Sequence, residues 1–145
     1  MKAPHLLRVE EGPERFAPLF AAAREAGLRL GWLDLAPPLA PPLVPADLEA
    51  AAGLGALRAV AVVGGQGGRS VAVKPLRGEP VLKDLLREHF RGCVLVLVRG
   101  VVAAPHLAPV GEGFRVTGTE GLARLYSPSS LAAVLRRPKP WSGTE

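Results

Sequence analysis

The chain has 145 residues, 48% of them apolar, so it is long enough to bury a substantial core and is not generally disordered. Its single cysteine, Cys93, excludes an internal disulfide and a zinc site built from cysteines. The net charge of +5 describes a basic protein that can attract an anionic partner.

The basic residues are unevenly distributed along the chain. Residues 1–57 hold five Lys and Arg against seven Asp and Glu, whereas residues 58–100 hold eight against three and residues 113–145 hold five against two. The chain has no Ile and no Asn, and its 14 Arg outnumber its four Lys. Few amides and many prolines predict a protein from a thermophile, while a GC-rich genome explains the Arg excess and the missing Ile equally well.

The chain begins with a strand pattern followed by a helix pattern. Residues 5–9 (HLLRV) predict a strand, and the apolar spacing that follows predicts a helix ending near Ala26. Pro18 would kink a helix that began at Pro13. A helix that starts near Ala17, with the proline in its first turn, is therefore the alternative.

Residues 28–35 predict a second strand, near the end of which stands Asp34. Ligands of open α/β sheets bind at the carboxyl ends of strands, so Asp34 either faces a ligand or caps a turn. Residues 36–46 contain five prolines and predict a rigid connector over the core, with docking into a partner's aromatic groove as the alternative. A short helix is expected at 47–52.

Residues 57–76 contain two apolar runs around a glycine-rich tip. A phosphate-binding loop needs a helix directly after its glycines, and here a second apolar run follows instead. We therefore expect a β-hairpin, with residues 57–63 antiparallel to 70–76. Pro75 places the second strand near an edge of the sheet.

The middle of the chain gives the clearest patterns. Residues 79–92 predict a helix, because Pro80 suits its first turn and Gly92 suits the position just after its end. Residues 93–98 are apolar at every position. That pattern predicts a central strand covered on both faces.

The C-terminal third predicts, in order, a loop at 99–113, a short strand at 114–116, a helical segment at 119–126 and a tail at 138–145. Between the helical segment 119–126 and the tail, Ser127 followed by Pro128 is typical of a helix start. This helix is expected to stop at Arg137, before a further proline.

These elements predict a single α/β domain over residues 1–145. It would have a mixed, mostly parallel sheet, helices packed on that sheet, and the hairpin at 57–76. The first 16 residues lack the apolar core of a signal peptide, and the run 93–98 is too short to span a bilayer. We therefore expect a cytoplasmic protein with no membrane partner.

An anion-binding site is the first candidate for chemistry. Backbone N–H groups of the glycine-rich tip can form an anion nest beside two basic side chains, and a plain turn is the alternative. A histidine in the loop 99–113, near Glu112, is a second candidate, because loops at strand ends carry function. The candidate ligand-binding residues are Gly65, Gly67, Gly68, Arg69, Lys74, His106 and Arg115.

Metal binding and catalysis find little support. No two histidines have the spacing of metal ligands, so no metal site is predicted and no cofactor is assigned. His89 lies four residues before Cys93, which permits a catalytic pair. Cys93 opens the most apolar run of the chain, however, where a buried and inert thiol is the ordinary outcome.

The C-terminal basic cluster consists of Arg136, Arg137, Lys139 and the aromatic Trp141. It can bind nucleic-acid phosphates while the indole stacks on a base. Alternatively, the two arginines interact with the C-terminus of their own helix and the indole packs back on the domain. Three functions stay open: binding of an anionic or phosphorylated small molecule, nucleic-acid binding, and a non-catalytic module for homo-oligomerisation or another interaction.

Overall fold

The computed structural model describes residues 4–35, 50–51, 53–63, 69–70, 82–100, 102–118, 120–137 and 140, with the backbone alone for 58–63 and 69–70. Its strands are β1 (His5–Val9), β2 (Leu30–Asp34), β3 (Arg58–Val63), β4 (Arg69–Ser70), β5 (Leu95–Arg99), β6 (His106–Val110), β7 (Gly113–Thr117) and β8 (Ala123–Tyr126). Its helices are η1 (Pro13–Phe16), α1 (Ala17–Glu25), α3 (Leu82–His89) and α4 (Pro128–Val134).

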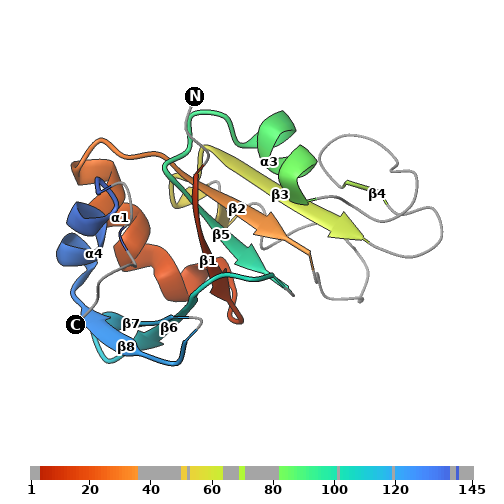
Figure 1. The fold of residues 1–145 in the computed structure, drawn as a ribbon. Coiled ribbons are helices and arrows are strands. Elements are labelled where there is room, and N and C mark those ends of the chain that lie inside the picture. The colour runs from red at the N-terminus through yellow and green to blue at the C-terminus, as the bar shows by residue number, and fades with distance from the viewer. Residues whose placement is uncertain are drawn as a thin grey trace.

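The described strands form one mixed sheet in the order β4-β3-β2-β5-β1-β6-β7-β8 (Figure 1). Strands β3, β2, β5 and β1 run parallel, and β6 joins β1 in parallel through one residue pair. Strands β6, β7 and β8 form an antiparallel meander. The α/β fold with a mixed sheet is therefore confirmed.

The expected hairpin is present where the structure describes it. Val62 pairs with Ser70 and Val63 pairs with Arg69, both antiparallel. Residues 71–76, the rest of its second strand, lie outside the described residues. So do the whole connector 36–46 and the tail 138–145 apart from residue 140.

Strand β5 lies at the centre of the sheet, as its uninterrupted apolar run predicted. It pairs in parallel with β1 on one side and β2 on the other. Val96 and Leu97 point to opposite faces of the sheet, and both are fully buried. Burial of such a side chain stabilises the fold by about 1.5–3 kcal/mol.

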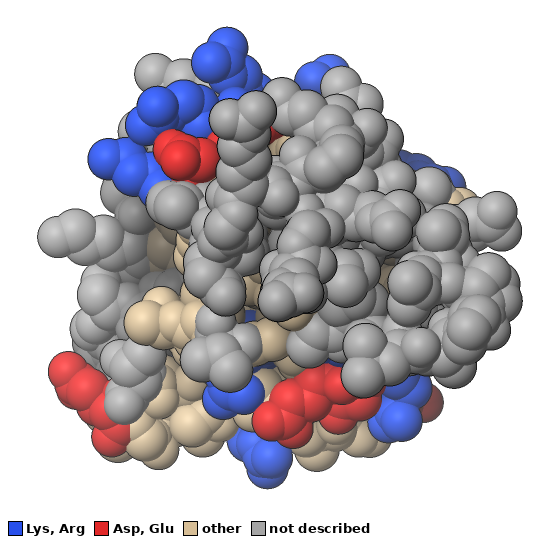
Figure 2. Space-filling view, turned by 90° about the vertical axis from the view of Figure 1, so that its right-hand side faces the viewer, with Lys and Arg blue, Asp and Glu red and all other residues tan. Residues whose placement is uncertain are grey.

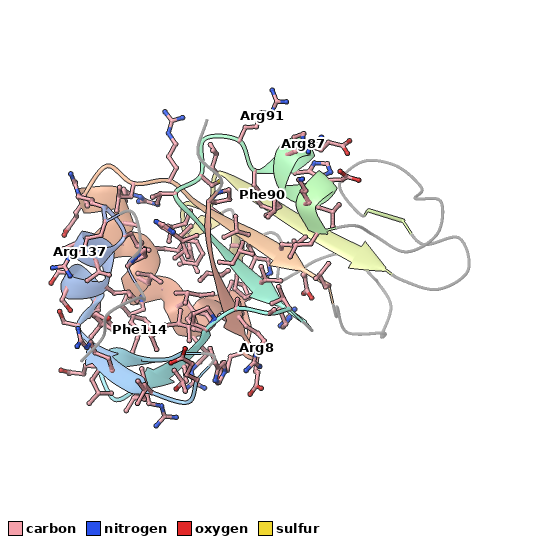
Figure 3. The ribbon with its side chains drawn as sticks, viewed as in Figure 1. Arg8, Arg87, Phe90, Arg91, Phe114 and Arg137 are labelled. Atoms are coloured by element: carbon pink, nitrogen blue, oxygen red, sulfur yellow. The ribbon has the colours of Figure 1, made fainter. Side chains whose placement is uncertain are left out.

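Helices cover both faces of the sheet and make three layers. On one face, α1 and α4 pack over a core that includes Leu7, Trp32 and Leu97. On the other face, α3 packs over Leu33 and Val96. In Figure 3 the two faces can be followed through Phe114, beside α1 and the meander, and Phe90, beside α3.

Two helix starts follow the local sequence. The chain forms η1 first and then α1 from Ala17, so the alternative with Pro18 in the first turn is confirmed. Ser127 caps α4, since its Oγ accepts a hydrogen bond from the Ser130 N–H at 3.1 Å. The Ser130 hydroxyl in turn accepts from the Ser127 N–H, which completes a capping box.

Two expectations for the C-terminal third are wrong. The segment 119–126 is not helical, because its second half forms β8 on the edge of β7, with Tyr126 buried and Leu125 exposed. The expected loop 99–113 contains β6. Both strands are only four or five residues long, and segments of that length carry too few residues to separate a helical from a strand period.

Close packing between β2 and the end of α3 gives a first testable prediction. A Cβ on Gly31 would lie 2.5 Å from Cδ1 of Phe90 and 3.2 Å from Sγ of Cys93. Phe90 is fully buried and has little room to move. We expect Gly31→Ala to lower the free energy of unfolding by about 1–3 kcal/mol in urea denaturation.

Gly53→Ala is the matched control for this substitution. A Cβ at Gly53 meets nothing within 4 Å, and the residue is helical. This variant should leave stability unchanged or raise it by up to about 1 kcal/mol, because alanine favours the helix. Equal unfolding midpoints for the two variants would contradict the close approach of Phe90 to β2.

Candidate functional site

The carboxyl ends of β1, β5 and β2 meet at one edge of the sheet. Val9, Arg99 and Asp34 lie side by side in the register of these parallel strands. From β1 the chain passes through α1 to β2 on one side, whereas from β5 it passes over β1 to β6 on the other. Such a change of direction is where open α/β sheets bind ligands.

A buried ion pair joins two of these strand ends. Arg99 donates hydrogen bonds to Oδ2 of Asp34 through Nε, at 3.0 Å, and through Nη2. Asp34 is 2% exposed and the Arg99 side chain 13%. Because removing two charges from water is costly, a pair in this position is weak evidence for stability alone.

Trp32 lies beside the ion pair on the same face of β2. The guanidinium carbon of Arg99 is 5.6 Å from the centroid of the indole, a cation–π contact. The ring of Phe16 packs against the indole of Trp32, with 6.3 Å between the two ring centroids. Trp32 is fully buried, yet its Nε1–H finds no hydrogen-bond partner within the described part of the chain.

Two more buried polar atoms lie where β1 ends and β6 begins. Nε2 of His106 is 3.9 Å from Oε1 of Glu10, beyond hydrogen-bond distance, and has no hydrogen-bond partner among the described residues. The same holds for Oε1 of Glu11, which follows in the loop after β1. Glu10 also accepts a hydrogen bond from Nη1 of Arg8 at 3.2 Å.

Comparison with protein-family models, with curated proteins and with solved structures finds no match for this chain. The chemistry of this edge therefore has to be derived from its own side chains. His106 lies on the opposite face of the sheet from Trp32, because it pairs with Arg8, whereas Leu7 and Trp32 share the core beneath α1 and α4. We therefore call the set of Trp32, Asp34 and Arg99 the carboxyl-edge cluster.

Hydrogen-bonding capacity defines what the carboxyl-edge cluster can bind. The indole N–H of Trp32 and the guanidinium of Arg99 can only donate hydrogen bonds. Buried polar atoms without partners are uncommon in native proteins and call for a specific explanation. A ligand oxygen that accepts a hydrogen bond would satisfy the indole of Trp32.

Of the ligand-binding residues named from the sequence, His106 and Arg115 share one face of the β6–β7 hairpin. His106 opens β6 and pairs with Thr117, so Arg115 lies diagonally across on the same face of the β6–β7 hairpin. The expected association of His106 with Glu112 is wrong, because Glu112 lies in the turn at the other end of β6.

The glycine-rich tip is only partly covered by the structure. Gly65, Gly67, Gly68 and Lys74 lie outside the described residues. Arg69 is described through its backbone, which belongs to β4 rather than to the turn. The anion nest therefore stays a prediction.

The C-terminal arginines do not share a face with Arg115. Nη2 of Arg136 donates to the carbonyl of Ala26 at 2.6 Å, so this arginine binds the C-terminal end of α1 and not, as the sequence indicated, the end of its own helix α4. Figure 3 shows Arg137 beside α4. Arg115 points away from the core that α4 covers. Lys139 and Trp141 lie outside the described residues.

Metal ligands do not gather in the part of the chain that the structure describes. No group of three or more His, Cys, Asp or Glu side chains there is suited to hold a metal ion. Cys93 is buried against the core beneath α3. Nor does any described helix have the length and apolar character needed to cross a bilayer.

Proposed function

We propose that the protein binds a small anionic or phosphorylated molecule at the carboxyl edge of β1, β2 and β5. The observation that carries this proposal is the fully buried Trp32, whose indole N–H has no hydrogen-bond partner among the described residues. An unsatisfied buried donor costs about 1–3 kcal/mol, which a ligand oxygen would recover. A cytoplasmic location and a thermophilic source belong to the same proposal.

The cluster favours an anionic ligand. An anionic oxygen would accept a hydrogen bond from Nε1 of Trp32, and any hydroxyl groups of the ligand would extend away from the indole. Arg99 adds positive charge beside the indole. In the sequence, the glycine run 64–68 directly follows the last residue of β3, whose carboxyl end lies along the same edge.

Binding can be measured by isothermal titration calorimetry with three related probes. Glycerol phosphate carries the anion and the hydroxyls, methyl phosphate carries only the anion, and glycerol carries only the hydroxyls. We expect the two phosphates to bind and glycerol to bind more weakly, because only the phosphates bring an anionic oxygen to the indole N–H. Equal and weak heats for all three would contradict this proposal.

Trp32→Phe tests the residue that carries the proposal. The substitution removes the N–H and keeps an aromatic ring, so it should weaken binding of glycerol phosphate by a factor of about ten or more, equivalent to a charge-assisted hydrogen bond. Tyr126→Phe removes a polar atom from a buried ring of β8, away from this edge, and should bind like the wild type. Unchanged affinity in Trp32→Phe would exclude the indole as a donor.

Trp32→Phe also distinguishes binding of a small molecule from the alternative, binding of nucleic acid. Binding through Arg136 and other surface cations would be steeply salt-dependent, with a log–log slope of about 0.9 per phosphate contacted for duplex DNA. It would also be unaffected by Trp32→Phe. Tight, salt-sensitive binding of DNA by both proteins would favour that alternative over the small molecule.

A further inference from the structure

The outer side of the β6–β7–β8 meander carries a surface that the carboxyl-edge cluster does not use. Phe114, Val116 and Tyr126 point inward to the core beneath α1 and α4. Side chains alternate along a strand, so their neighbours Arg115 and Leu125, which pair with each other, point outward. We call the outward residues of these strands the outer meander face: His106, Ala108, Val110, Arg115, Thr117, Ala123 and Leu125.

Exposed apolar side chains concentrate on this part of the molecule. Among the described residues four large apolar side chains are exposed, and three of them belong to the meander: Leu125 at 69%, Leu122 at 61% and Val110 at 39%. Single exposed apolar residues need no explanation, but a group on one sheet face marks an interaction site. Strand β8 is also the last strand of the sheet on this side.

The outer meander face and the turns beside it carry charges of both signs. Arg115 is the one Lys, Arg, Asp or Glu residue among its members, and exposed Glu112 and Glu120 stand in the turns at the two ends of β7. Figure 2, the view from the right-hand side of Figure 1, shows that charges of both signs also stand along the lower margin of that side. A two-fold axis crossing β7 between Glu112 and Arg115 would set each arginine against the partner's glutamate.

We propose that the outer meander face binds a second copy of this chain in a two-fold symmetric dimer. Leu125 and Val110 supply apolar contacts on the two outer strands, and two reciprocal pairs between Arg115 of one copy, on the middle strand, and Glu112 of the other fix the orientation. A surface that carries exposed apolar side chains together with both signs of charge can be self-complementary, which an isologous interface requires. This inference is independent of the proposed ligand site.

Sedimentation equilibrium of the full chain tests the proposal directly. We expect a concentration-dependent monomer–dimer equilibrium, and we expect Leu125→Glu to raise the dimer dissociation constant by a factor of about thirty or more. Leu57→Glu is the matched control, since Leu57 is the fourth exposed large apolar side chain and lies between α1 and β3 in the chain, away from the meander. A wild-type monomer at every concentration, or equal effects of the two variants, would overturn the dimer.

Charge reversal tests the orientation of the two copies. Arg115→Glu places like charges against each other and should weaken the dimer by a factor of about ten. Adding Glu112→Arg to the same chain restores opposite charges at both symmetric contacts and should recover the wild-type dissociation constant. Additive weakening in the double variant would overturn this arrangement, and circular dichroism confirms that each variant is folded.

Discussion

Val96→Asp is expected to abolish cooperative folding of the domain. Val96 is fully buried in the central strand β5, with β1 and β2 on its two sides and α3 above it. A carboxylate there would lose its hydration, at a cost of several kcal/mol, and a domain of this kind is stable by only about 5–15 kcal/mol. Far-ultraviolet circular dichroism in increasing urea should show no sigmoidal transition, or one at a greatly lowered midpoint.

Leu57→Asp provides the comparison for this substitution. Leu57 is 38% exposed, so the same charge introduced there stays hydrated and should change the free energy of unfolding by less than about 1 kcal/mol. If Val96→Asp unfolded cooperatively at nearly the wild-type midpoint, β5 could not be buried on both faces.

Breaking the ion pair between Asp34 and Arg99 is expected to have the second largest effect on the free energy of unfolding. Asp34→Leu would leave the buried guanidinium of Arg99 without its carboxylate, and Arg99→Met would leave Asp34 without its guanidinium. Each should lower the free energy of unfolding by about 3–5 kcal/mol in urea denaturation, because a buried charge that loses its ion-pair partner is strongly destabilising.

The double variant distinguishes the destabilisation caused by one buried charge without its partner from the contribution of the ion pair to the free energy of unfolding. Asp34→Leu combined with Arg99→Met replaces two buried charges by apolar side chains, and should be more stable than either single variant. Strictly additive losses would show that the two side chains do not interact in the folded protein.

Local sequence patterns were sufficient for several elements of the fold. The apolar run at 93–98 identified the central strand, Pro18 placed the start of α1, and Ser127 placed the start of α4. Each of these depends on a few consecutive residues. The position of β5 between β1 and β2 does not, because it is set by pairing between distant segments.

In the candidate site, too, the sequence could identify some residues from local patterns but not those set by contacts between distant segments. Asp34 was recognisable as a ligand candidate because it stands near the end of a strand pattern. Arg99, its partner 65 residues away, was not, although a charged residue that ends the most apolar strand is a usable signal. His106 was associated with the wrong glutamate, since the segment that holds it was expected to be a loop and instead forms β6 beside Glu10.

The indole N–H resonance of Trp32, followed by proton–nitrogen NMR during titration with glycerol phosphate, tests the proposed site most directly. Comparison with the Trp32→Phe spectrum assigns the signal and separates it from that of Trp141. The proposed site predicts a saturable downfield shift of the Trp32 indole proton as its N–H acquires an acceptor. An unchanged Trp32 signal in the presence of bound ligand would contradict it.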